Sequence, residues 1–320
     1  MGKARLADIA REAGVGTATV ERVLNERGGV AADTARKVIL AAKRLGYRRN
    51  LPEAHRGTIR IEVVMVRPET PFFDRLNKAF ERISASLDSS ILVHRTFSDE
   101  ADPAKFAQHI LTSTIRRSGL IVVAVDHPDV RRSLDKLRSD GVVVVHVVSP
   151  TGRSEDIFVG IDNYAAGRTA GLYMHNMLRG VEGKVLGVCH SWVYRVHRER
   201  IRGFSDFLRD RPDTRLDFSE VLFSLDDEVR AAEVLRSALE REENVVGVYN
   251  AGGANEGIAS VLHWRRSMGR QPILWLGHEL TDQTRQYLKW GLMTVAFDQA
   301  PEIQARRSLD TIMKRLGVIN

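Results

Sequence analysis

The chain has 320 residues, of which 43% are apolar and 28% are charged. This is the composition of a globular protein large enough for more than one hydrophobic core. No apolar run reaches the roughly 18 residues that a membrane span needs, and the N-terminal segment MGKARLADIAREAG lacks the apolar region of a secretory signal. The one cysteine, Cys189, cannot form an intrachain disulfide, so we expect a buried thiol in a protein of the reducing cytoplasm.

The formal net charge of +7 is confined to the N-terminal region. Residues 1–60 contain 13 Lys and Arg against 6 Asp and Glu, whereas the other 260 residues contain 35 of each sign. A neutral body with a basic N-terminal module indicates a polyanionic partner. A basic surface that is merely solvated is the alternative, which charge alone leaves open.

Three short helices are predicted within residues 5–46. The first is LADIAREA, Gly14 then supplies a tight turn, and the second helix runs over residues 17–25. The third has Asp33 or Thr34 as its N-terminal cap. Two short helices that are joined by a glycine turn and braced by a third are typical of a helix-turn-helix, whose second helix enters the major groove of DNA.

The second helix, within GVGTATVERVLN, has one apolar side and one side of small or polar residues. The apolar side, which we expect to pack on the neighbouring helices, consists of Val15, Val20, Val23 and Leu24. The other side leaves Thr17, Ala18, Arg22 and Asn25 to face the groove. Arginine suits guanine, asparagine suits adenine, and a methyl group contacts thymine. A three-helix cap with solvated residues on this side is the alternative.

From residue 59 onward, apolar β-branched runs alternate with amphipathic stretches. The predicted strands are residues 59–66, 91–95, 119–125, 142–148, 157–161, 184–189, 245–249, 273–277 and 293–297. The predicted helices are residues 73–87, 103–117, 129–139, 164–179, 194–210, 227–241, 254–266, 281–290 and 301–316. Nearly continuous apolar runs such as GLIVVAV are typical of parallel strands covered by helices on both faces. We therefore expect an α/β body of doubly wound parallel sheets in two lobes, joined to the helical module by a polar linker at 48–58.

Several segments resemble the lactose/galactose repressor family. LADIAREAGVGTATVERVLN and VAADTARKVILAAKRLGYRRN resemble its DNA-binding headpiece over residues 5–50 without gaps. FVGIDNYAAGRTAG, RERIRGF and FDQAP resemble its periplasmic-binding-protein-like effector domain. The resemblance implies a small all-α helix-turn-helix headpiece at residues 1–47, a hinge at 48–58, and an effector-binding and dimerisation domain at 59–320. The implied lobes are about 59–162 with 300–320, and about 163–299.

The resemblance also implies which headpiece residues contact DNA. Thr17, Ala18 and Arg22 are the base-reading positions. The full predicted set of DNA contacts is Arg5, Thr17, Ala18, Thr19, Arg22, Asn25, Thr34, Tyr47, Asn50 and Leu51. Gly16 stands where the family usually has Ser, which weakens the helix cap by about a few tenths of a kcal/mol. Glu21 replaces a small polar residue, and it either accepts from a cytosine amine or points away from the DNA.

The linker departs from the family pattern. In the family this segment forms a hinge helix whose leucine is wedged into the minor groove. Here Arg49 replaces the usual proline, and no leucine lies near residues 54–56. Leu51 is the one apolar candidate for the wedge, and contacts from residues 48–50 are the alternative.

The effector site is predicted between the lobes, because ligands of two-lobed α/β proteins bind at the carboxyl ends of the strands. Phe72 and Phe73 follow the first strand, and we expect them to stack on a pyranose or polyol unless one belongs to the core. Arg198 opens RERIRGF and aligns with the ligand-binding arginine of the family. A surface salt bridge to Glu199 or Asp206 is its alternative role.

Three later segments complete the predicted effector site. In YNAGGAN, Asn250 and Asn255 are predicted to hydrogen-bond ligand hydroxyls beside a glycine pair that allows close approach. A helix-capping turn without a ligand is the alternative. Glu279 of LGHELTD stands where the family more often has aspartate, and Gln299 of FDQAP matches a ligand residue near the hinge. Residues 162–164, at the crossover between the lobes, fit a structural turn and a ligand contact equally well.

These features together predict a sequence-specific DNA-binding transcriptional regulator, as a repressor of carbohydrate use. It binds operator DNA as a homodimer or tetramer and is controlled by a sugar, polyol or sugar-acid effector. No cofactor, metal ion or membrane partner is predicted. The alternative is a sugar solute-binding protein without a DNA role. An enzyme is disfavoured because no strand is followed by GxGxxG or GxxxxGK[ST] and no His/Cys cluster has metal-ligand spacing.

Overall fold

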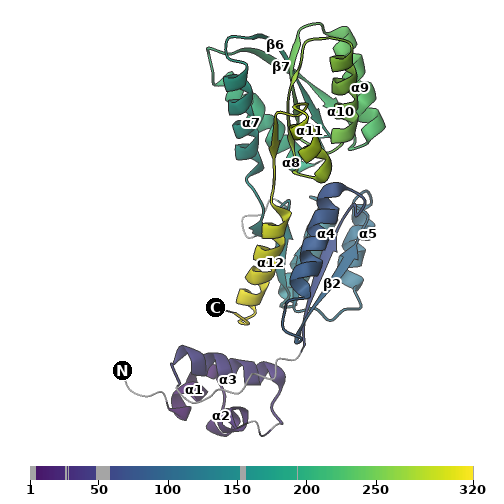
Figure 1. Cartoon of the computed structure of the whole chain (residues 1–320). Helices are drawn as coiled ribbons and strands as arrows, with labels where there is room; N and C mark the ends of the chain where they lie inside the picture. Colours follow the sequence, from purple (N-terminus) through teal and green to yellow (C-terminus); the bar gives the residue numbers. More distant parts are fainter. Residues whose placement is uncertain are drawn as a thin grey trace.

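The computed structural model of the chain describes residues 5–25, 27, 29–47, 58–151, 156–192 and 194–319. Figure 1 shows a small helical unit at the N-terminal end and two α/β lobes, with the last helix of the chain in the lobe that follows the helical unit. Within the described residues, no helix is both long enough and apolar enough to cross a lipid bilayer.

The helical unit contains three helices around a small core of its own. The helices are α1 (Leu6–Ala13), α2 (Thr17–Leu24) and α3 (Ala32–Arg44). Its buried apolar residues are Ile9, Ala10, Val20, Val23, Val38, Ile39, Ala41 and Ala42. Gly14 ends α1 with a φ of 66°, a left-handed conformation that glycine adopts without a steric penalty. The predicted glycine turn between the first two helices is therefore present.

The predicted cap of α3 was wrong. The helix begins at Ala32, and the amide of Ala35 donates to the carbonyl of Ala31 at 2.9 Å. Asp33 and Thr34 consequently lie inside the first turn. The helix dipole favours an acidic residue there as well as at the cap, so the sequence pattern did not distinguish the two positions.

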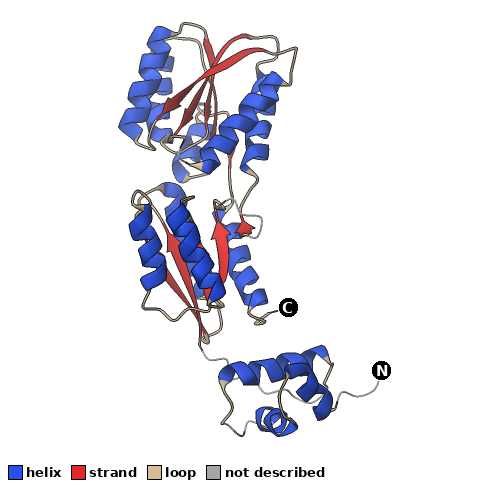
Figure 2. Ribbon diagram, turned by 180° about the vertical axis from the view of Figure 1, so that it is seen from behind, coloured by secondary structure: helices blue, strands red, loops and turns tan. Residues whose placement is uncertain are grey.

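The first lobe is a five-stranded parallel sheet with helices on both faces (Figure 2). Its elements in chain order are β1 (Ile59–Met65), α4 (Pro71–Ser84), β2 (Ile91–Phe97), α5 (Pro103–Thr112), β3 (Gly119–Val122), α6 (Pro128–Ser139), β4 (Val143–Val147) and β5 (Ile157–Val159). The strand order is β2-β1-β3-β4-β5. The C-terminal helix α12 (Pro301–Arg315) packs beside α4 and buries Ala305, Leu309 and Ile312 in the core of this lobe.

The second lobe repeats this architecture. Its elements are α7 (Asn163–Met177), β6 (Glu182–Cys189), α8 (Arg195–Arg209), β7 (Arg215–Phe223), α9 (Glu228–Arg241), β8 (Val245–Asn250), α10 (Asn255–Ser267), β9 (Leu274–His278), α11 (Asp282–Lys289) and β10 (Val295–Phe297). The parallel strands are ordered β10-β9-β8-β6-β7. The expected fold class, an all-α helix-turn-helix unit followed by two doubly wound parallel sheets, is confirmed.

One strand was missing from the prediction. Strand β7 pairs with β6 alone and lies at the edge of its sheet. The first part of its sequence, RLDFS, alternates exposed polar residues with apolar ones, as a half-exposed edge strand does, and its continuous apolar run, VLF, is only three residues long. The prediction relied on continuous apolar runs and therefore passed over it.

The strands of both lobes end in loops that surround one cavity. The chain crosses between the lobes after β5 and again after β10, so the carboxyl ends of the two sheets face each other (Figure 1). The described non-glycine residues with positive φ all lie in these loops: Arg67, Val148, Leu225, Asp226, Ala254, Glu279 and Ala300. Such backbone conformations cost free energy and are found most often at functional sites. Their position around this cavity therefore marks it as a candidate functional site.

Candidate functional site: the reading helix and the interlobe cavity

Helix α2 presents a distinct exposed face. Val20 and Val23 are buried in the core of the helical unit. The exposed residues of this segment are Thr17, Ala18, Glu21, Arg22 and Asn25, and Thr19 is partly buried. This face carries small side chains, a guanidinium and a carboxamide, which are the groups that read base edges in a major groove.

The other predicted DNA contacts lie around this helix or outside the described residues. Arg5 is exposed at the start of α1, where its amide donates to Asp8 at 3.0 Å. Thr34 is partly buried in the first turn of α3, and Tyr47 packs against the core of the helical unit. Asn50 and Leu51 lie outside the described residues, as does most of the linker, so their roles stay predictions.

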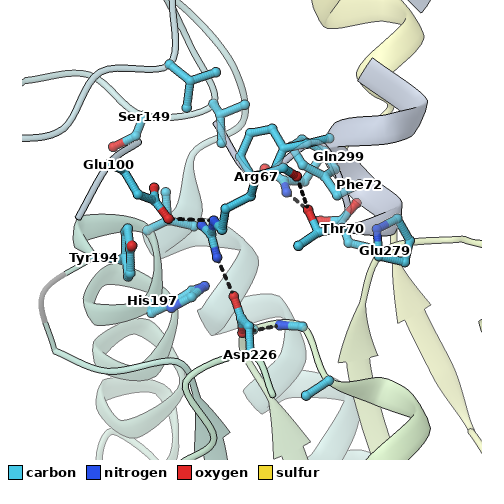
Figure 3. A pocket seen from close by; sticks show the side chains of 18 of the residues that line it. Arg67, Thr70, Phe72, Glu100, Ser149, Tyr194, His197, Asp226, Glu279 and Gln299 are labelled. Carbon is cyan, nitrogen blue, oxygen red and sulfur yellow. Dashed lines mark hydrogen bonds and ion pairs between the residues drawn. The ribbon is translucent and has the colours of Figure 1, made fainter. Parts of the chain in front are cut away.

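The interlobe cavity has a volume of about 160 Å³ and is lined by loops from both lobes (Figure 3). Phe72, Phe73, Asn255, Glu279 and Gln299 from the predicted effector set line it. Arg198 and Asn250, from the same set, are not among the lining residues.

The arginine of RERIRGF that lines the cavity is Arg200, whereas Arg198, the arginine predicted to bind the ligand, does not line it. Arg198 is exposed and donates to the carbonyl of Trp192 at 2.6 Å. Two residues apart on a helix means about 200° of rotation, so both side chains cannot point to the same side. His197, Ile201 and Phe204 are buried on the inward face of α8, and their spacing identifies position 200 as inward.

Two of the three side-chain nitrogens of Arg200 donate hydrogen bonds to neutral groups, and the third has no hydrogen-bond partner. Its side chain is 2% exposed. Nε donates to Oδ1 of Asn163 and Nη1 donates to the carbonyl of Ala251, each at 2.9 Å. The second terminal nitrogen, Nη2, is buried without a hydrogen-bond partner. A buried donor without a partner is costly, which makes this atom a candidate contact for a ligand.

Close helix packing explains how Arg200 is positioned. A Cβ on Gly167 of α7 would lie 2.0 Å from the carbonyl of Arg200, and a Cβ on Gly203 of α8 would lie 2.1 Å from the carbonyl of Tyr164. The two glycines therefore let α7 and α8 approach backbone to backbone. Asp162 caps α7 by accepting from the amide of Ala165, so residues 162–164 serve as a structural turn here.

Glu279 and Gln299 form the second polar group of the cavity. The carboxamide of Gln299 donates to Oε1 of Glu279, while Oε2 of Glu279 and Oε1 of Gln299 are buried without partners. Burial raises the pKa of Glu279 to about 7, against the opposing influence of the Arg200 charge and the Gln299 hydrogen bond. Two acceptor atoms thus remain open to a ligand beside the open donor of Arg200.

The two phenylalanines have different surroundings. Phe73 is 5% exposed and belongs to the core of the first lobe, whereas Phe72 is only partly buried. Their ring centroids are 5.1 Å apart in an edge-to-face arrangement. Phe72 is therefore the ring with more surface to offer a ligand (Figure 3).

The asparagines of YNAGGAN organise the loop between β8 and α10. Asn250 is fully buried, donates to the carbonyl of Gly253 and to Asn255, and accepts from the amide of Gly252. Asn255 in turn donates to the carbonyl of His278 at 3.2 Å. The geometry agrees with the alternative of a structural turn for Asn250, whose polar atoms are already used. Asn255 reaches the cavity wall while holding the loop.

The polar lining residues that the sequence interpretation missed include Arg67, Glu100, Tyr194 and Asp226. Arg67 and Glu100 follow β1 and β2, so a charged residue just beyond an apolar strand was the available signal. Asp226 follows β7, the strand that the sequence interpretation did not find. Tyr194 is the N-terminal cap residue of α8.

Two family models match the chain. Residues 5–50 match the model described as bacterial regulatory proteins, lacI family. Residues 61–317 match the model described as periplasmic binding protein domain.

The relatives with curated descriptions are transcriptional regulators. The chain is 31% identical to the HTH-type transcriptional regulator MalR of Streptomyces coelicolor over 169 residues, covering 51% of this chain and 47% of that protein. It is 27% identical to the HTH-type transcriptional repressor PurR of Mannheimia succiniciproducens, with 53% and 51% covered. The match to the HTH-type transcriptional regulator GalR of Salmonella typhimurium is 24% identical and covers 77% and 70%. The chain spans about half the length of the first two relatives.

Similar solved structures include proteins named as solute-binding or sugar-binding proteins. A solute-binding protein from Burkholderia graminis, in complex with D-arabinose, superposes with a TM-score of 0.73 at 21% identity and covers 82% of this chain and 90% of its own. The arabinose-binding protein AraP of Geobacillus stearothermophilus superposes with a TM-score of 0.65 at 21% identity, with 80% and 87% covered. This likeness shows the fold of the two lobes. The chain therefore belongs to the periplasmic binding protein domain family over residues 61–317 and carries, at residues 5–50, the helix-turn-helix domain of the lacI family of bacterial regulatory proteins.

Proposed function

We propose that the protein is a transcriptional regulator, acting as a repressor of carbohydrate use, whose helical unit binds operator DNA under the control of a sugar or polyol. The observation that carries the proposal is the combination of a lacI-family helix-turn-helix with a two-lobed domain whose cavity holds open hydrogen-bonding atoms. The relatives named as regulators support the same role.

The exposed face of α2 is the proposed reading surface. Thr17, Ala18 and Arg22 are the proposed base contacts, with Asn25 near the sugar-phosphate backbone. The positive charge of residues 1–60 supplies the sequence-independent attraction to phosphate. Base specificity then comes from the few side chains that reach the groove.

The cavity suits a ligand with hydroxyl groups. Arg200 offers a donor, while Glu279 and Gln299 offer acceptors. A hydroxyl group both donates and accepts, so neighbouring hydroxyls of a sugar or polyol satisfy this mixture. The ring of Phe72 supplies an apolar surface for the carbon skeleton.

We expect the protein to form a homodimer and to act in the cytoplasm, where it has access to operator DNA. Residues 1–47 are the proposed DNA-binding domain, 48–58 the hinge, and 59–320 the effector and dimerisation domain. Large apolar side chains are exposed on α10 and at the end of α11, at Trp264, Met268 and Trp290, with exposures of 48%, 63% and 57%. Exposed apolar surface of this kind marks interaction sites, which supports self-association through the second lobe.

Arg22 provides a direct test of base reading. The full chain first selects a duplex from a random pool, and fluorescence anisotropy then gives its affinity for that duplex and for a scrambled one. Arg22→Ala is expected to weaken binding to the selected duplex by about 1–3 kcal/mol with a smaller effect on the scrambled duplex, because a base contact is lost.

The control is Arg44→Ala, which removes an exposed arginine of α3 that pairs with Glu12 at 3.5 Å. This variant is expected to retain the preference for the selected duplex. An equal loss on both duplexes after Arg22→Ala would show that Arg22 contacts phosphate only, and base reading by this residue would be rejected.

A further inference from the structure

Arg67 bridges the two lobes at the cavity. It lies in the loop after β1, in the first lobe (Figure 3). Its Nε lies 2.6 Å from Oε1 of Glu100 in the same lobe, and its Nη1 donates to Oδ2 of Asp226 in the second lobe at 2.7 Å. The three side chains are 22%, 11% and 13% exposed, so water screens these ion pairs much less than pairs on an open surface.

Two aromatic rings complete the surroundings of the guanidinium. The centre of the Arg67 guanidinium lies 5.3 Å from the ring centroid of Phe73 and 4.9 Å from that of Tyr194. Both distances fall within cation–π range. Tyr194, from the second lobe, also forms a side-chain hydrogen bond to Glu100 of the first. Each lobe therefore contributes one carboxylate and one ring.

The backbone on both sides is adapted to this arrangement. Arg67 has a φ of 44° and Asp226 has a φ of 55°, both unusual for residues with a side chain. The amide of Gly253 donates to Oδ1 of Asp226 at 2.9 Å, and a Cβ on Gly252 would lie 2.9 Å from the same oxygen. The sequence predicted that a ligand would approach the backbone of Gly252 and Gly253 closely. In the structure, the side chain of Asp226 fills the space beside these two glycines.

We propose that Glu100, Phe73, Asp226 and Tyr194 form a guanidinium-binding site that spans the cleft, and that Arg67 fills it as an internal ligand. Because the site is complete only when both lobes contribute, its occupation by Arg67 holds the lobes together in the absence of an effector. We call these four residues the guanidinium cage. Glu279 and Gln299 lie on the side of Arg67 opposite to Glu100 and Tyr194 (Figure 3). The proposal rests on the proposed function only in placing the effector beside Glu279 and Gln299.

The first test measures the separation of the lobes in the full chain without effector or DNA. Spin labels are placed through Gln108→Cys on α5 and Ser237→Cys on α9, both exposed, while the buried Cys189 stays unlabelled. Electron–electron double resonance then gives the distance distribution. Arg67→Met is expected to shift the distribution to longer distances and to broaden it, because the side chain keeps its length but loses the charge that joins the lobes.

Two further variants make this result decisive. Asp226→Asn keeps an acceptor for the Gly253 amide but removes the charge, and it is expected to give the same shift. Arg131→Met removes an ion pair with Asp126 that lies within the first lobe, and it is expected to give no shift. Distributions for Arg67→Met and Asp226→Asn that match that of Arg131→Met would overturn the proposal, while the proposed DNA and effector binding would still stand.

The second test asks whether the guanidinium cage recognises a free guanidinium. Arg67→Ala leaves the cage empty, and millimolar methylguanidinium is expected to raise the melting temperature of this variant more than methylammonium at the same concentration. The planar cation matches two carboxylates and two rings, whereas the ammonium does not. Arg131→Ala is the control and is expected to show no difference between the two salts. The absence of a selective rise in Arg67→Ala would contradict recognition by the cage.

Discussion

At the scale of single residues, the cavity is defined by polar atoms that the fold buries without satisfying. Arg200 keeps one open donor although two of its nitrogens are bonded, and Glu279 and Gln299 each keep an open acceptor. Folding tolerates few such atoms, because each costs free energy unless a ligand pairs with it. The open atoms of these three residues therefore mark where binding free energy is available.

The first prediction separates the two arginines of α8. Arg200→Met is expected to weaken effector binding by about 1.5–3 kcal/mol, because a hydrogen bond from a charged group is lost. The affinity is measured by calorimetry with a sugar that raises the melting temperature of the wild-type chain. Arg198→Met is the matched control and is expected to retain the wild-type affinity, because its side chain lies outside the cavity. Equal losses in the two variants would contradict the placement of Arg200.

The second prediction concerns pH. Burial raises the pKa of Glu279 to about 7, from a reference value of 4.5 for the free side chain. The folded state therefore binds more protons than the unfolded state between these values, and the free energy of unfolding must fall as the pH rises through this window. The contribution is about 3 kcal/mol, at 1.36 kcal/mol per pKa unit.

Urea unfolding of the two-lobed domain, followed in the full chain at pH 5, 6, 7 and 8, measures this contribution. The wild type is expected to lose stability relative to Glu279→Gln between pH 5 and 7, and the difference is expected to level off above pH 7. Parallel pH profiles for the two proteins would show that Glu279 does not titrate in this range.

At the scale of elements, the repeating βα pattern was readable from sequence because parallel strands buried on both faces are continuous apolar runs. Strands β3 and β4, and helix α6 between them, begin and end within a few residues of the predictions. Edge strand β7 was not readable in this way, because it pairs with one neighbour only and its first five residues alternate between polar and apolar. Asp226 was missed with it.

The sequence predicted where the cavity lies, but not how all of its side chains are oriented and paired. Topology brings the carboxyl ends of the strands together, so Phe72, Glu279 and Gln299 were located from their positions after strands. The orientation of Arg200 depends on helix phase and on the close approach of α7 and α8, and the pairing of Arg67 with Asp226 depends on two lobes that are distant in sequence. The spacing of the apolar residues in α8 does indicate that position 200 faces inward, but local pattern carries no information on contacts between residues of different helices or lobes.

The third prediction tests the packing of α7 against α8. Gly203→Ala adds a Cβ that would lie 2.1 Å from the carbonyl of Tyr164, so the helices must move apart. Overpacking of this kind costs about 1–3 kcal/mol, and it also displaces Arg200 from its two partners. Thermal unfolding is expected to show a lower melting temperature, and calorimetry a weaker affinity for the effector. Arg202→Ala, on the exposed side of the same helix, is the control; a loss of the same size there would argue against the packing explanation.

At the scale of the whole molecule, regulation requires that the effector prefers one arrangement of the lobes. A hundredfold preference corresponds to about 2.7 kcal/mol, which is enough to change the occupancy of DNA substantially. The cavity is built from both lobes, so a ligand there contacts residues whose separation changes when the lobes move. The chain crosses between the lobes after β5 and again after β10, and we expect these two crossings to act as the pivot of such a movement.

The most direct measurement is the competition between a selected duplex and scrambled DNA for the full chain, with and without the stabilising sugar. We predict that the selected duplex binds at least about a thousandfold more tightly, that affinity falls steeply with added salt, and that the sugar changes the preference by tenfold or more. Equal affinity for selected and scrambled duplexes, unaltered by any sugar or polyol that stabilises the protein, would contradict the account.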